Sequence, residues 1–184
     1  MKKTCWLVMS LCCLAACSPR RPVLETHTAI DPDTMHPELF ILDLDITVRN
    51  FFALQKFYLT PKSLFTRPPS EKDKEWATGI VRAEAEALNN EFPVAYQDAH
   101  GPFDPPQGAM PLHKHSFAIF DSNSERNDAI WEAARLRANF SSDISALYWA
   151  RTSKKATPAE IARLEKTLEE SKDAMVKGGQ LLVH

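Results

Sequence analysis

All four cysteines of the chain lie within its first seventeen residues, at positions 5, 12, 13 and 17. The residues after Cys17 therefore have no disulfide to stabilise them, even in an oxidising compartment. They also have no thiolate for binding a metal or for nucleophilic catalysis. This part of the chain is long enough for one domain, and the core of that domain must form from apolar side chains alone.

The N-terminus has the pattern of a secretory signal. Lys2 and Lys3 precede an apolar run from Cys5 to Ala16 that only Ser10 interrupts. A positive start followed by a short apolar core and small residues is typical of an export signal. The run is too short to cross a bilayer as a stable helix, which needs about 20 apolar residues. We expect residues 1–16 to be a signal peptide rather than a lasting anchor.

The end of this signal, Leu14-Ala15-Ala16-Cys17, resembles the lipobox of bacterial lipoprotein precursors. In that family the cysteine receives a diacylglycerol thioether, the chain is cut before it, and the new amino group is acylated. The resemblance implies lipidation at Cys17 and permanent attachment to a membrane, since two or three acyl chains bind far more firmly than one. Ser18, rather than Asp, follows the cysteine. Through the sorting habits of that family, the resemblance implies the periplasmic face of the outer membrane.

Residues 17–36 read as a flexible tether, because they include three prolines and show no helical periodicity. Arg20 and Arg21 would either contact lipid headgroups or remain solvated linker charges. The net charge of −2 gives no basic surface for nucleic acid. We expect a single helix-rich domain over 37–184, with the membrane and an envelope protein as partners.

The low glycine content, five residues against thirteen prolines, favours a mainly α fold. Residues 38–59 form the most apolar segment after the signal, and their length favours a helix with a narrow polar stripe that includes an Asp45–Arg49 pair. Alternation over 39–48 fits a strand instead. The sequence leaves both alternatives open, with the helix preferred.

The next boundaries follow from capping residues and prolines. Ser70 and Asp73 predict the start of a helix over 71–91 that Pro93 ends. Residues 92–114 then form a proline-rich loop, and 115–121 form a short strand.

Two further helices are predicted toward the C-terminus. Ser122 and Glu125 make a capping box for a helix over 123–152. Thr157 and Pro158 begin a last helix, which Gly178-Gly179 close. The short link between them predicts an antiparallel pair in a helical bundle-like domain.

One stretch points to chemistry. Residues 40–48, FILDLDITV, resemble the first motif of haloacid dehalogenase-like phosphatases. The resemblance implies Asp43 as nucleophile and Asp45 as acid and base, with Mg²⁺ between them and the phosphate, and it needs later acids, for which Asp121 and Asp128 are available. The chain departs from that family at Phe120, where glycine is usual, and lacks its regular alternation of strands and helices.

Two other groups of residues are candidates for binding. A His-x-His pair places two imidazoles on one face of a strand, which suits a transition metal. The weak metal candidates are Asp98, His100, His113, His115, Asp121 and Asp128. Trp131 and Trp149 are five helical turns apart, and they would form either an exposed patch for a partner or part of a buried layer.

The sequence contains no glycine-rich phosphate loop and no HExxH or GxSxG motif. It therefore predicts a non-catalytic, membrane-anchored binding or adaptor domain that needs no cofactor. A divergent phosphatase that uses Asp43, Asp45 and Mg²⁺ is the alternative.

Overall fold

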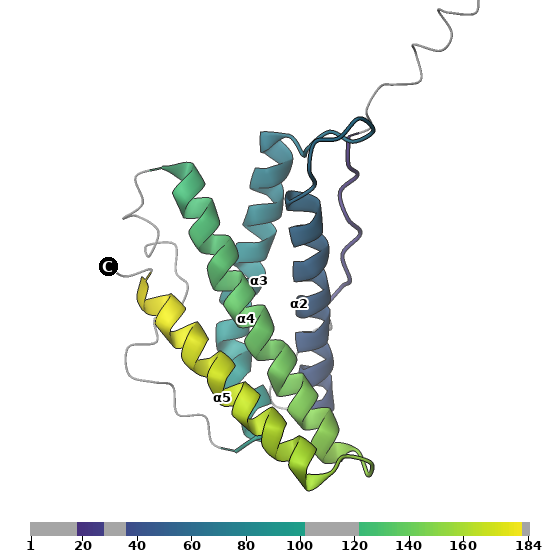
Figure 1. The fold of residues 1–184 in the computed structure, drawn as a ribbon, viewed down its shortest axis with the longest axis vertical. Helices are drawn as coiled ribbons and strands as arrows, with labels where there is room; N and C mark the ends of the chain where they lie inside the picture. Colours follow the sequence, from purple (N-terminus) through teal and green to yellow (C-terminus); the bar gives the residue numbers. More distant parts are fainter. Residues whose placement is uncertain (1–17, 28–35, 102–121, 182–184) are drawn as a thin grey trace, which may run out of the picture.

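The computed structural model describes residues 18–27, 36–101 and 122–181 (Figure 1). Within these ranges the chain forms four helices and no strand: α2 (Pro37–Tyr58), α3 (Glu71–Ala99), α4 (Asn123–Thr152) and α5 (Pro158–Leu181). The predicted mainly α, bundle-like fold is confirmed. The predicted strand over 115–121 lies outside the described residues.

Helix α2 decides between the two interpretations of residues 38–59. It begins with Pro37 in its first turn, carries Glu38 there and has Lys56 in its last turn, all of which favour a helix. Its buried side chains come from every turn, so apolar burial continues along its whole length. The helix is confirmed, and the alternative strand over 39–48 is wrong.

Helix α3 begins where predicted but ends later. The Ser70 side chain accepts a hydrogen bond from the backbone N–H of Asp73, which confirms the N-cap. Pro93 lies inside the helix instead of ending it, and residues 92–99 are helical rather than part of a loop. A proline in a helix interior costs about 3 kcal/mol. Burial of Phe92, Ala95, Tyr96 and Ala99 around it offsets that cost.

Helix α4 is the central element of the bundle, because it packs against each of the other three helices. Its predicted capping box is present, with Ser122 and Glu125 exchanging hydrogen bonds at the start. Apolar and small residues are buried on several of its sides, from Ile130 to Leu147.

Helix α5 forms the predicted antiparallel pair with α4, across a link of five residues, 153–157 (Figure 1). Thr157 accepts a hydrogen bond from the N–H of Glu160, as expected for its N-cap. The glycines do not end the helix. Gly178 lies within α5 at a close approach to Leu136 of α4, where an added Cβ would come within 2.1 Å of Leu136 Cδ1.

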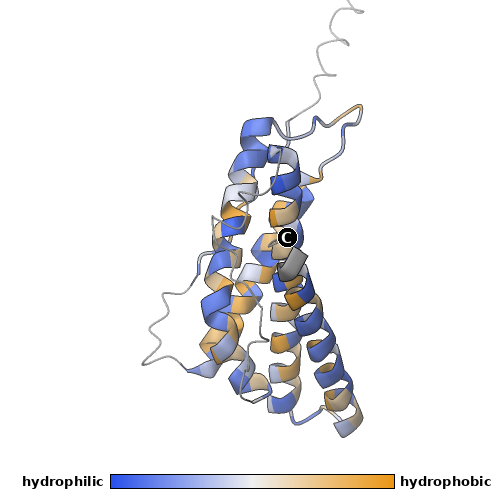
Figure 2. Cartoon of the chain, turned by 90° about the vertical axis from the view of Figure 1, so that its left-hand side faces the viewer, coloured by the Kyte–Doolittle hydropathy of each residue, from blue (hydrophilic) through white to orange (hydrophobic). Residues whose placement is uncertain are grey.

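The helices run up, down, down and up in chain order as drawn in Figure 1, so α3 and α4 are parallel. Two hydrophobic clusters fill the bundle. The upper cluster joins α2, α3 and α4 around Phe51, Leu54, Phe57, Val81, Ile130 and Trp131. The lower cluster adds α5 and is built around Ile41, Leu44, Phe92, Phe140, Ile144, Leu147 and Leu168. Polar residues cover the outer faces of the helices (Figure 2).

Candidate functional site

The segment 18–27 lies against the helices, so the prediction of a flexible tether is wrong for these residues. Arg21 Nε donates to Asp73 Oδ1 at 2.8 Å, and its guanidinium lies over the Trp76 ring, 4.5 Å from the ring centroid. Leu24 packs against the upper cluster. We call residues 18–27 the docked segment. Residues 28–35, the remainder of the predicted tether, lie outside the described residues.

Glu25 fixes the middle of the docked segment to α2. Arg49 donates to both oxygens of its carboxylate, at 2.7 and 2.8 Å. Asn50 uses its amide twice, because its Oδ1 accepts from the Glu25 backbone N–H at 2.8 Å and its Nδ2 donates to the Glu25 carbonyl at 3.0 Å. Arg49 thus binds Glu25 as its near partner rather than the predicted Asp45. The Asn50 amide thus pairs with both backbone polar groups of Glu25, as a neighbouring strand does in a β-sheet.

His27 connects the segment to both helices beneath it. Its Nδ1 lies 3.1 Å from Asp43 Oδ2 on α2, and its Nε2 lies 3.4 Å from Glu84 Oε1 on α3. A protonated imidazole donates from both nitrogens and suits two carboxylates at once. Burial opposes that charge, but the hydrogen bonds and charges of Asp43 and Glu84 outweigh it and raise the pKa of His27.

A third carboxylate, Glu91, lies on α3 about two helical turns after Glu84. Burial, together with the negative charges of Asp43 and Glu84, raises the pKa of Glu91 to about 7. Burial likewise raises the pKa of Glu84, against the opposing effects of His27 and Asn50. We call His27, Asp43, Glu84 and Glu91 the carboxylate–histidine cluster. Glu91 therefore binds and releases a proton near neutral pH.

The cluster does not have the geometry of a metal site. Among the residues that the structure describes, no three histidine, cysteine, aspartate or glutamate side chains are arranged to hold a metal ion. The chemistry that the arrangement supports is proton binding coupled to attachment of the docked segment.

The predicted phosphatase pair is separated by the helix. Asp43 is only 2 % exposed and faces His27, whereas Asp45, two residues further on, lies half-buried on another side of α2. Residues two apart on a helix are about 200° apart around its axis, so they do not face one metal ion. The strand end that the family motif requires is a helix interior here.

The metal candidates in the described residues are not brought together. His100 follows the last turn of α3 at the lower end, with its ring 5.0 Å from that of Tyr96. Asp98 is exposed on that turn, and Asp128 lies near the opposite end of the bundle, lining a hollow with Tyr58 and Trp131. His113, His115 and Asp121 lie outside the described residues, as does Cys17.

The two tryptophans do not form a shared surface patch. Trp131 is buried in the upper cluster, where its Nε1 donates to Thr78 Oγ1 at 3.1 Å. Trp149 is half-buried and packs beside Tyr148 on the lower cluster. Of the two alternatives, an exposed patch and a buried layer, the structure shows the buried layer for Trp131. The helices bury the indole of Trp131 because its ring fills space between α2 and α3.

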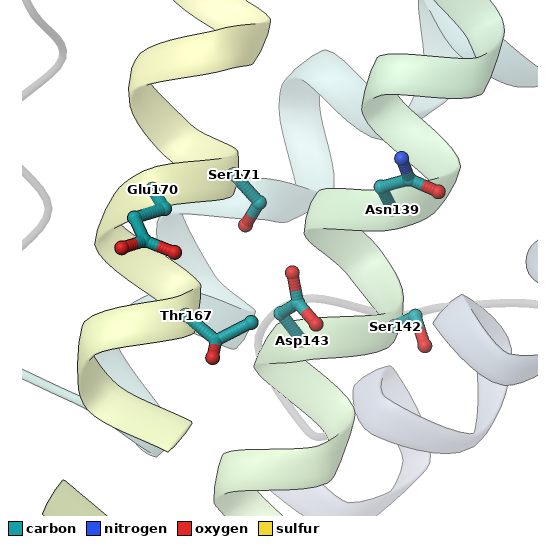
Figure 3. A pocket seen from close by; sticks show the side chains of 6 residues that line it. All are labelled: Asn139, Ser142, Asp143, Thr167, Glu170 and Ser171. Atoms are coloured by element: carbon teal, nitrogen blue, oxygen red, sulfur yellow. The ribbon is translucent and has the colours of Figure 1, made fainter. Parts of the chain in front are cut away.

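An open groove of about 420 Å³ lies between α4 and α5. Its lining is entirely polar: Asn139, Ser142, Asp143, Thr167, Glu170 and Ser171 (Figure 3). Asp143 points from α4 toward Thr167 and Ser171 of α5. Burial raises the pKa of Asp143, although a hydrogen bond with Ser171 opposes this. The groove presents hydroxyl and carboxylate oxygens to solvent.

Sequence reasoning missed His27, Asn50, Glu84 and Glu91. A partial signal was present in α2, where Asp43, Thr47 and Asn50 follow one another at helical spacing within an otherwise apolar face. All three are buried, so the helix has a polar strip directed at something other than solvent. Nothing local identified the docked segment as its partner.

Comparison with known proteins gives no match: no family model fits the sequence, and no curated protein or solved structure is similar to it. Within the described ranges, none of the helices combines the length and apolar character needed to span a membrane.

Proposed function

We propose that the protein is a lipid-anchored, non-catalytic adaptor domain of the bacterial envelope, attached through Cys17 to the periplasmic face of the outer membrane. The observation that carries the proposal is the docking of residues 18–27, which directly follow the lipobox, along α2 and α3. An anchor joined to a docked segment holds the folded domain in a defined orientation. A bound envelope protein would then be held at a fixed position near the bilayer.

The polar cluster supports an adaptor rather than a catalyst. His27 bonds to Asp43 of α2 and to Glu84 of α3, and these two contacts hold the end of the docked segment. The surface we assign to the partner is the groove between α4 and α5, because its oxygen-rich lining suits amide and ammonium donors (Figure 3). Those two helices form the face opposite the docked segment.

Metabolic labelling with radioactive palmitate tests the anchor. The wild-type chain should incorporate label and sediment with membranes, and Cys17→Ser should lose both properties. Cys13→Ser is the matched control, since the same substitution in the expected signal peptide leaves the acylated residue in place. Mass spectrometry should find an acylated N-terminal peptide that begins at residue 17. An unlabelled, freely diffusing product in cells that process other lipoproteins would refute the proposal.

A further inference from the structure

The loop of residues 59–70, which joins α2 to α3, carries the most exposed large apolar side chains among the helix connections in the described ranges. Leu64 is 82 % exposed and Phe65 is 71 % exposed, with Leu59 also in solvent. The loop at the upper end of the molecule is coloured as apolar at its tip (Figure 2). Adjacent exposed Leu and Phe side chains on a projecting turn are costly in water and indicate a surface that meets an apolar phase.

Several backbone groups of this tip are paired within the loop itself. The Ser63 N–H donates to the Thr66 carbonyl at 2.9 Å. Ser63 Oγ accepts from the N–H groups of Phe65 and Thr66, at 3.2 and 3.1 Å, and Thr66 Oγ1 donates to the Pro61 carbonyl at 3.2 Å. Unpaired backbone groups are what bars irregular loops from lipid. Each backbone group paired within the turn lowers the cost of bringing the loop into contact with an apolar phase.

The charge of the loop is complementary to an anionic surface. Lys62 and Arg67 flank the apolar pair and are exposed, and residues 59–70 contain no acidic side chain. The acids in the adjoining first turn of α3 have basic partners, Glu71 with Lys74 at 3.0 Å and Asp73 with Arg21 at 2.8 Å. Apolar residues between lysine and arginine are the pattern of segments that lie in the headgroup region of a membrane.

The loop also lies at the end of the bundle from which the proposed lipid anchor would emerge. The docked segment runs along α2 with Arg21 at the first turn of α3, so residue 18 emerges at the same upper end as the α2–α3 loop (Figure 1). An acyl chain on Cys17 would enter the bilayer beside this loop.

We propose that the α2–α3 loop is a second membrane contact, with Leu64 and Phe65 inserted at the headgroup–acyl boundary and with Lys62 and Arg67 on lipid phosphates. The partner is the surface of an anionic bilayer. This inference rests on the proposed lipid anchor, which brings the loop to that surface. The acyl chains and the loop together fix the long axis of the bundle relative to the membrane, with the α4–α5 turn directed away from it.

Cysteine usage gives a direct test. Once residues 1–16 are removed and Cys17 is acylated, the chain has no free thiol, so Leu64→Cys introduces a single site for an environment-sensitive dye. The matched control is Leu42→Cys, an exposed leucine (43 %) on the lower half of α2. The full chain, purified from membranes, is reconstituted in vesicles of phosphatidylethanolamine and phosphatidylglycerol, with and without bromine on the acyl chains.

The dye at position 64 should show blue-shifted emission and strong quenching by brominated lipid, and the dye at position 42 should show neither. Lys62→Ser combined with Arg67→Ser should reduce the quenching at 64. Replacing phosphatidylglycerol by phosphatidylcholine should reduce it as well. A dye at 64 that stays in water, or equal quenching at 64 and 42, overturns the inference. Blue-shifted emission without quenching by brominated lipid also overturns it, since a protein surface would then cover the loop.

Mass spectrometry of the same preparation separates this inference from the proposed function. An acylated Cys17 with no quenching at position 64 refutes the loop contact and leaves the anchor intact. An unmodified Cys17 refutes the anchor, and that cysteine would then also take up dye. In that case quenching at 64 on vesicles supports the loop contact alone, and its absence refutes both.

Discussion

Two layers cover the three-helix core of α2, α3 and α4, and they are attached by different physics. Helix α5 lies on α4 through an apolar seam in which Leu168 is fully buried and Met175 nearly so. The docked segment lies on α2 and α3 mainly through ion pairs and hydrogen bonds, with Leu24 as its one large apolar contact to the core. The first layer has the stability of a core, whereas the second responds to protons and salt.

The two layers should therefore respond differently to pH. Apolar burial changes little with pH, so the α4–α5 face should keep its shape under all conditions in which the chain is folded. The attachment of the docked segment depends on His27 and Glu84, and the pKa values of both side chains are raised. In the proposed orientation, a change in pH would therefore alter the attachment of the segment nearest the membrane before it altered the α4–α5 face.

The largest expected effect is on the apolar layer. Leu168→Ala should lower the free energy of unfolding by about 2–5 kcal/mol, because it removes a fully buried side chain and leaves a cavity between α4 and α5. Chemical denaturation followed by circular dichroism measures this loss. Leu24→Ala makes the same change in the docked segment, where the side chain is only half-buried, and should cost about 1 kcal/mol. Equal losses in the two variants would contradict the comparison.

The sequence predicted the helices of the core and the apolar layer better than it predicted the docked segment. The starts of α3, α4 and α5 followed from Ser70, Ser122 and Thr157, because capping is local and depends on residues three apart. The antiparallel pairing of α4 and α5 followed from the short link between them. The predicted ends of α3 and α5 were wrong because Pro93 and Gly178 were judged by their intrinsic preference. Packing of Tyr96 and Leu136 beside them overrides that preference.

The polar layer was not predicted, for a physical reason. Its contacts join residues far apart in the chain: Arg21 with Asp73, and His27 with Glu84. Such pairs have no periodicity, and a proline-containing segment with few apolar residues resembles a linker. The site prediction identified Asp43 but gave it a nucleophile's role, since nothing local shows that a histidine sixteen residues earlier faces it.

The second prediction concerns protons. The pKa of Glu91 rises from 4.5 to about 7 on folding, so the folded chain binds more protons than the unfolded chain between these values. Stability must therefore fall as the pH rises through that window. His27 acts in the same direction, because a raised histidine pKa gives stability that is present at low pH and lost as pH rises through the folded value.

Glu91→Gln removes this carboxyl group and should raise the free energy of unfolding at pH 8 by on the order of 1–2 kcal/mol, allowing for its partial exposure to solvent. At pH 4 the variant and wild type should be nearly equal. Denaturation at a series of pH values gives both numbers. Glu170→Gln is the control, since that carboxylate is exposed on α5, 3.6 Å from Lys166. A wild-type stability that rises between pH 5 and 7 would refute the role of the cluster.

The smallest expected effect tests how closely α5 approaches the core. Gly79 lies inside α3 and Gly178 inside α5, and each position would gain roughly 0.5–1 kcal/mol of helix preference if alanine replaced the glycine. Gly79 has open space around the position of a Cβ, so Gly79→Ala should be stabilising by that amount. Gly178→Ala should be less favourable by about 1 kcal/mol or more, because the new methyl group displaces the end of the Leu136 side chain. In a Leu136→Ala background, where that side chain is absent, Gly178→Ala should recover the gain seen at Gly79. If both alanines stabilise the wild-type chain equally, α5 does not need a glycine to pack at this distance from α4, and the apolar layer is looser than the structure indicates.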